Sequence, residues 1–250
     1  LSADDLAGTP DFPTDRVDWE AVLAYKRGLL EQAFARFEAA PDHPLHTELW
    51  HFAQAQGHWL DDYALYAALS EASGTSWTEW PQDLAQRHPH ALHEARQEYA
   101  RAFRMHQFWQ FLFDRQWQSL RSYCNTRGIY VLGDLPIYVA HDSADVWANQ
   151  HQFYLDAAGQ PTVVSGVPPD YFSETGQRWG NPLYRWDVMR QSGYTWWKAR
   201  VANILRLVDG IRLDHFRGFA GYWEIPASDE TAMNGRWVAG PGASLFEALS

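Results

Sequence analysis

The amino-terminal part of the chain is dominated by apolar residues at helical spacing. From Val17 to about Ala100, nonpolar side chains recur every three or four positions, which is the period of a helix that buries one face. Gly74 and Pro81 interrupt the pattern, so more than one helix is expected. The positions that carry the pattern are Leu23, Leu30, Phe34 and Phe37 in the first segment and Leu60, Ala64, Ala67 and Ala68 in the second.

A longer helix is predicted from Tyr99 to Arg127. Gly128 follows at the position where a helix commonly ends in a left-handed residue. The apolar residues of this segment are Phe103, Phe108, Phe111, Leu112, Trp117 and Leu120.

Two apolar runs then read as β-strands. "IYVLGDLPIYV" contains Asp134, and "VDGIRLDHFRGF" is centred on Ile211 and follows a predicted helix from about Trp186 to Leu207. Near-continuous apolar runs are typical of parallel strands that are buried on both faces. Two helix-then-strand units in succession predict an α/β protein in which an aspartate lies toward the carboxyl end of each strand.

The two strands are separated by far more chain than a simple strand-helix-strand unit needs, which is about thirty residues. The excess, from His141 to about Arg185, is rich in Gly, Pro and aromatic residues and has little regular periodicity. Long irregular segments of this kind are usually binding loops or lids. We therefore expect a mainly helical subdomain at 1–98 and an α/β part at 99–250, with an inserted binding loop at about 141–185.

The second strand carries two opposite charges. Alternation along a strand puts Arg212 and Asp214 on the same face, about 6.6 Å apart along the chain, so the guanidinium can orient the carboxylate. A neighbouring arginine keeps an aspartate ionised, as a nucleophile requires. A structural salt bridge explains the same pattern, and His215 either orients a substrate hydroxyl or caps the pair.

The amino-acid composition argues against some classes of binding partner and favours others. The formal net charge of −11 argues against nucleic acid, and no apolar run reaches the roughly 18 residues that span a membrane. The 14 Trp and 12 Tyr indicate an aromatic core and surfaces suited to sugars. The single cysteine, Cys124, fits a reducing cytosol, and the 11 His show no spacing typical of a metal site.

Several long motifs resemble one family. "WLDDYALYAAL", "GDLPIYVAHDSADVW", "GVPPDYFSETGQRWGNPLY", "IRLDHFRGF" and "GRWVAGPG" run through almost the whole chain. They are similar to the 4-α-glucanotransferases, also called amylomaltases or disproportionating enzymes, of the α-amylase superfamily. The resemblance implies a (β/α)8 TIM barrel with inserted subdomains. It also implies retaining transfer of α-1,4-glucan segments between maltooligosaccharides or other α-glucans, without a cofactor or a metal.

The resemblance also assigns residues. It implies that Asp214 is the catalytic nucleophile and Arg212 its supporting catalytic arginine. Asp134 matches the aspartate that shapes the site near the cleaved bond. The remaining substrate-binding candidates are Asp170, Trp179 and Asn181 in the irregular segment and His215 beside the nucleophile; for Trp179 a core position is the alternative.

One part of the family pattern is missing. The general acid/base, a glutamate in a motif like "EDLG", is not found before Ser250, and Glu224 and Glu247 do not lie in such a motif. The chain is therefore expected to be an internal piece, a partial barrel that is inactive alone. An α-glucan hydrolase and a non-catalytic starch-binding fragment remain as alternatives.

Overall fold

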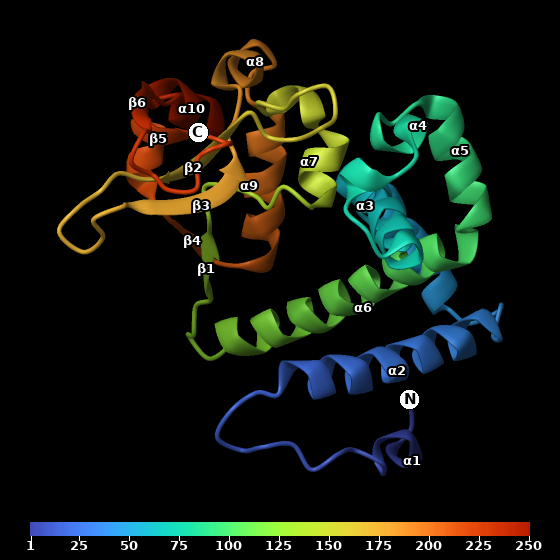
Figure 1. Cartoon of the computed structure of the whole chain (residues 1–250). Helices are drawn as coiled ribbons and strands as arrows, with labels where there is room; N and C mark the ends of the chain where they lie inside the picture. The colour runs from blue at the N-terminus through green and yellow to red at the C-terminus, as the bar shows by residue number, and fades with distance from the viewer.

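The amino-terminal half of the chain is helical, as the apolar spacing predicts. The computed structural model describes residues 1–250, and α2, α3 and α6 are its long helices (Figure 1). Gly128 adopts φ +73° just after α6, which confirms the predicted helix end. The elements of this half are α1 (Ala3–Leu6), α2 (Trp19–Glu38), α3 (Leu45–Ser73), the 3-10 helix η1 (Trp77–Glu79), α4 (Gln82–Ala85), α5 (Pro89–Glu98) and α6 (Ala100–Asn125).

Phenylalanines hold α2 and α6 together. The rings of Phe37 and Phe108 stack with their centroids 4.5 Å apart, and Phe34 is completely buried beside them. Leu49 of α3 closes the same cluster. Burying such side chains stabilises a fold by about 1.5 to 3 kcal/mol each, so this small core fixes the helices against one another. No helix of the chain is both long enough and apolar enough to cross a membrane.

The two predicted parallel strands form the centre of the carboxyl-terminal half. β1 (Leu132–Leu135) pairs with β4 (Gly210–Leu213) in a two-stranded parallel sheet, with Asp134 opposite Arg212. The expectation that these strands are buried on both faces is wrong, because Leu132 is 78% exposed. Each strand has only the other as a hydrogen-bonded neighbour, so one edge of each is open.

Asp209 anchors the start of β4. Its carboxylate accepts hydrogen bonds from the backbone N–H of Val131 at 2.8 Å, from Asn125 at 2.9 Å and from Arg121 at 2.7 and 2.9 Å. The bond from Val131, followed by those from Asn125 and Arg121, lowers the pKa of Asp209 to about 2. One side chain therefore ties the end of α6, the approach to β1 and the start of β4 to one another.

The segment predicted as an irregular loop is more ordered than expected. It contributes two strands of a four-stranded antiparallel sheet in the order β3-β2-β5-β6. The prediction failed because these strands are short and carry Gly and Pro; at Gly166 of β2 an added Cβ would lie 2.2 Å from the carbonyl oxygen of Gln177. The elements are α7 (Ala144–Ala148), η2 (Gln150–Gln152), β2 (Val163–Val167), β3 (Gln177–Pro182), β5 (Gly221–Pro226) and β6 (Arg236–Ala239).

The helix predicted from Trp186 to Leu207 is divided in two. Gly193 and Tyr194 adopt positive φ values of +63° and +57° and end the first part, since this backbone conformation cannot continue a helix. Tyr194 is buried, and its hydroxyl lies 2.7 Å from that of Ser244. The remaining elements are α8 (Trp186–Gln191), α9 (Thr195–Leu207), η3 (Phe216–Phe219) and α10 (Ala243–Leu249).

An aromatic core lies between α9 and the antiparallel sheet. Tyr184 is fully buried at its centre and donates a hydrogen bond from its hydroxyl to the carbonyl of Ile137 at 2.8 Å. Three of the 14 tryptophans pack against Tyr184 in this core. The aromatic neighbours of Tyr184 are Tyr138, Phe153, Trp186, Trp196 and Trp197.

Candidate active site

Arg212 links two aspartates at the carboxyl ends of β1 and β4. Its guanidinium donates to both carboxylate oxygens of Asp134, at 3.0 and 2.6 Å, and to one oxygen of Asp214 at 3.2 Å. The alternation argument is confirmed, because all three side chains lie on one face. The main partner of Arg212, however, is Asp134, and hydrogen bonding to Asp134 is the largest cause of the raised pKa of Arg212.

Asp214 sits at the point where the strand ends. Its backbone N–H still donates to the carbonyl of Leu135 at 3.0 Å, which continues the parallel pairing by one residue. His215 then adopts φ +49° and the chain turns tightly. An added Cβ at Gly218 would lie 2.7 Å from Cδ1 of Ile137 and 2.9 Å from the His215 ring, so the turn leaves little room for a side chain there. The turn leaves the second carboxylate oxygen of Asp214 without a hydrogen bond from protein.

The three charged side chains are open to solvent. Relative exposure of the side chain is 68% for Arg212 and 56% for Asp214. The premise that this strand buries its charges is therefore wrong, since the open strand edges leave them hydrated. Exposed ion pairs contribute little to stability, so stability alone gives little reason for this arrangement.

Trp179 and His215 form the neighbouring wall. Their rings meet edge to face, with centroids 4.8 Å apart. Burial lowers the pKa of His215, with the nearby charge of Asp214 opposing the change. Tyr138, which the sequence reasoning missed, lies 6.4 Å from Trp179 between ring centroids. Its only sequence signal was its place in the "GDLPIYV" run.

Asn181 links β3 to the segment after β1. Its amide nitrogen donates to the carbonyl of Val139 at 3.0 Å, and its amide oxygen accepts from the hydroxyl of Ser165 at 3.4 Å. The amide therefore holds Trp179, two residues earlier on the same strand, in register with the β1 side of the site.

Asp170 lies at the tip of the hairpin between β2 and β3, which projects away from β1 and β4 (Figure 1). One carboxylate oxygen accepts from the backbone N–H groups of Phe172 and Ser173, both at 2.9 Å. The structure does not bring Asp170 into contact with Asp214. Tyr171 and Phe172 beside it are almost fully exposed, at 97% and 91%, so the tip presents two free aromatic rings.

No other carboxyl group is placed as a proton donor beside Asp214. Both oxygens of Asp134 already accept from Arg212. Glu224 is buried in the antiparallel sheet, and Arg236 contacts it at 2.6 and 2.7 Å. No group of three or more His, Cys, Asp or Glu residues gathers where it could hold a metal ion.

The chain matches known proteins along nearly its whole length. The family model described as 4-alpha-glucanotransferase matches residues 2–250. The chain is 48% identical over 246 residues to a 4-alpha-glucanotransferase of Synechocystis sp., covering 98% of this chain and 49% of that protein. It is also 48% identical over 241 residues to the 4-alpha-glucanotransferase of Thermus thermophilus, covering 96% and 48%. The chain thus spans about half the length of the curated relatives it matches.

The fold agrees with the sequence comparison. An amylomaltase from Streptococcus agalactiae, solved in complex with acarbose, superimposes with a TM-score of 0.93 at 36% identity. This match covers 100% of the chain and 50% of the amylomaltase. The α/β fold is therefore that of amylomaltase, and the chain belongs to the 4-alpha-glucanotransferase family.

Proposed function

We propose that this chain is the nucleophile-bearing part of an enzyme that transfers α-1,4-glucan segments from a donor maltooligosaccharide or starch chain to an acceptor glucan or glucose. The observation that carries the proposal is Asp214, which follows directly after β4 and is held by Arg212. Catalytic groups project from the carboxyl ends of parallel barrel strands. The β1–β4 pair supports a partial (β/α)8 barrel at 99–250, with 1–98 as its helical insertion.

The proposed reaction is a double displacement. The free oxygen of Asp214 attacks the anomeric carbon, the leaving glucan oxygen takes a proton from a general acid, and a covalent glucosyl ester forms. The same group, now a base, removes the proton from the 4-hydroxyl of an acceptor glucan, which attacks the ester and restores the configuration. In retaining enzymes the two carboxyl groups stand about 5 to 5.5 Å apart, and no free carboxyl is so placed here.

The binding roles follow from where each side chain lies. Trp179 offers a partly exposed aromatic face to a sugar ring, and His215 offers a ring nitrogen to a hydroxyl. Asn181 acts mainly by holding β3, and Asp170 by shaping the hairpin tip. The acarbose in the Streptococcus agalactiae structure supports α-glucan ligands.

The single free thiol, Cys124, supports the cytosol as the location of the protein.

A plain α-glucan hydrolase shares the nucleophile strand and differs in the acceptor. The exposed pair Tyr171 and Phe172 favours transfer, because movement of their hairpin from its outward position to a position over the ester would exclude water. A starch-binding fragment without catalysis explains the aromatic residues but not an aspartate held at a strand end by an arginine.

The experiment that tests the proposal is trapping of the ester. In a polypeptide that also carries the segments present in the relatives, a 5-fluoro-glucosyl donor is expected to label the peptide containing Asp214. Asp214→Asn should abolish the label, whereas Asp229→Asn, at a half-buried aspartate just after β5, should keep it. Label on another carboxylate would show that Asp214 is not the nucleophile, and longer products from maltotriose would separate transferase from hydrolase.

A further inference from the structure

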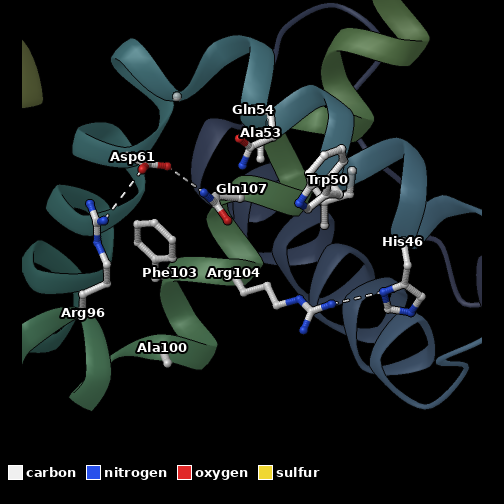
Figure 2. Close-up of a pocket in the computed structure, with 12 residues that line it drawn as sticks. His46, Trp50, Ala53, Gln54, Asp61, Arg96, Ala100, Phe103, Arg104 and Gln107 are labelled. Atoms are coloured by element: carbon white, nitrogen blue, oxygen red, sulfur yellow. Dashed lines mark hydrogen bonds and ion pairs between the residues drawn. The ribbon is translucent and has the colours of Figure 1, made fainter.

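A groove of about 600 Å³ lies between helices of the amino-terminal half (Figure 2), and its lining includes no residue of the site around Asp214. One wall is a stripe of α3 in which Trp50, Ala53, Gly57 and Asp61 recur at helical spacing. The facing wall continues from the end of α5 into α6, and its members are Arg96, Ala100, Phe103, Arg104 and Gln107. Sites for small ligands usually have volumes of about 300 to 1,000 Å³, so the groove has the size of a binding site.

Small residues keep the groove open. Ala53 and Gly57 on α3 face the side of Ala100, and large side chains at these positions would fill the space between the helices. An added Cβ at Gly57 would meet no atom within 4 Å. A glycine inside a helix costs about 0.5 to 1 kcal/mol relative to alanine. No close backbone approach requires Gly57, so nothing in the packing of the helix offsets that cost.

The polar groups at one end of the groove are already oriented. Asp61 accepts a hydrogen bond from the amide of Gln107 at 2.9 Å and lies 3.7 Å from the guanidinium of Arg96. The Arg96 guanidinium also lies over the ring of Phe103, 5.0 Å from its centroid. Arg104 points to the other side, where one of its nitrogens lies 3.1 Å from His46 (Figure 2).

An aromatic face stands beside these polar groups. Trp50 is 59% exposed at the groove, although a side chain of this size normally buries most of its surface. Flat side chains such as Arg, Asp and Gln donate to and accept from neighbouring hydroxyls, while an indole face covers the apolar side of a sugar ring. Aromatic and polar groups therefore meet here in the combination that a carbohydrate needs.

We propose that this groove is a second, non-catalytic site for an α-1,4-glucan chain, with Trp50 as its stacking platform. The identity of the sugar rests on the proposed function. An anionic ligand fits less well, because Asp61 places a carboxylate in the wall and the two arginines already have partners in Asp61 and His46. A neutral ligand with both donors and acceptors matches all of these groups.

Such a site has a use for an enzyme that acts on polymers. A glucan held at the groove raises the effective concentration of its other segments near the chain, as linked binding sites do. Short substrates that cannot span the groove and the proposed active site receive no such increase in effective concentration. The groove therefore favours long glucans without taking part in the reaction.

The test uses the 250-residue chain in a Trp179→Ala background, so that the groove is measured apart from the proposed active site. Titration calorimetry with maltoheptaose should show binding that falls at least tenfold in Trp50→Ala and in Gly57→Leu. Gly57→Leu places bulk in the open groove and improves helix propensity, so it should keep or raise the melting temperature. Trp19→Ala, at an exposed tryptophan of α2 outside the groove, should leave the affinity unchanged.

Three outcomes overturn the inference. These are no binding of maltoheptaose, binding that is indifferent to both groove variants, and displacement of maltoheptaose by inorganic phosphate, which would indicate an anion site. The test is independent of chemistry at Asp214. If trapping of the ester fails while groove binding depends on Trp50, the proposed function falls and the glucan site stands.

Discussion

Gly166 in β2 offers a sharp test of how the antiparallel sheet supports the site. In Gly166→Ala the new Cβ would lie 2.2 Å from the carbonyl oxygen of Gln177 and 2.5 Å from Cδ1 of Ile225. Both distances are about 1 Å or more inside ordinary contact. Neither neighbour can move freely, since one is backbone of the paired strand β3 and the other is a completely buried side chain.

The expected cost is that of overpacking a core, about 1 to 3 kcal/mol. For a chain of this size each kcal/mol shifts the melting temperature by about 2 to 4 °C, so a fall of about 2 to 12 °C is expected. Gly166 is paired with Arg178, immediately before Trp179. The displaced strand should therefore also weaken the proposed binding of maltooligosaccharides at Trp179.

The assay is thermal unfolding followed by tryptophan fluorescence, together with maltotriose titration. Gly28→Ala is the matched control, because Gly28 lies inside α2 and an added Cβ there meets nothing within 4 Å. The control should be more stable by about 0.5 to 1 kcal/mol. If both variants melt at or above the temperature of the original chain, the close packing of β2 against β3 is refuted.

Three further predictions concern other parts of the molecule. In a polypeptide that also carries the segments present in the relatives, Tyr171→Ala with Phe172→Ala should raise the ratio of hydrolysis to transfer, measured as glucose against longer products. Equal loss of both activities would indicate that the hairpin only supports the structure of the site. Burial lowers the pKa of His106, against the opposing charge of Glu71 and with a smaller lowering contribution from Arg27. The unfolded chain therefore binds a proton more readily, and the free energy of unfolding should decrease as pH falls below about 6.5. His106→Gln should flatten this dependence in denaturant titrations, and an unchanged dependence would contradict the assignment to His106. The 250-residue chain alone should produce neither glucose nor longer sugars from maltotriose, and turnover by chain free of host enzyme would refute its dependence on a further acid/base.

The sequence predicted those elements whose side chains repeat with a clear period. α2, α3 and α6 followed from apolar spacing, and the common face of Arg212 and Asp214 followed from alternation. The position of Asp134 in an apolar run indicated it as a candidate site residue. Its role as the main partner of Arg212, however, depends on the β1–β4 register. That register joins residues far apart in the chain, so periodicity alone could not reveal it.

The parts that were missed have weak local signals. β2 and β3 are five and six residues long and contain Gly166, Gly180 and Pro182, which are uncommon inside strands. Their stability comes from pairing across the sheet rather than from local preference. The only local signal for the break between α8 and α9 is Gly193, and a single glycine within a helical pattern does not by itself predict a helix end. The groove beside Trp50 arises between two helix faces and has no motif of its own.

The pairing of β1 with β4 has a consequence for the order of folding. Asp134 and Arg212 are 78 residues apart in the sequence, and the intervening chain includes β2, β3, α8 and α9. Contacts at such separation form late, because the entropy of closing the loop is lost before the contact contributes. Contacts between elements that are adjacent in the sequence, such as α5 and α6, can form earlier. The charged cluster around Arg212 is then completed near the end of folding, so a molecule that holds Asp214 correctly has already ordered most of its carboxyl-terminal half.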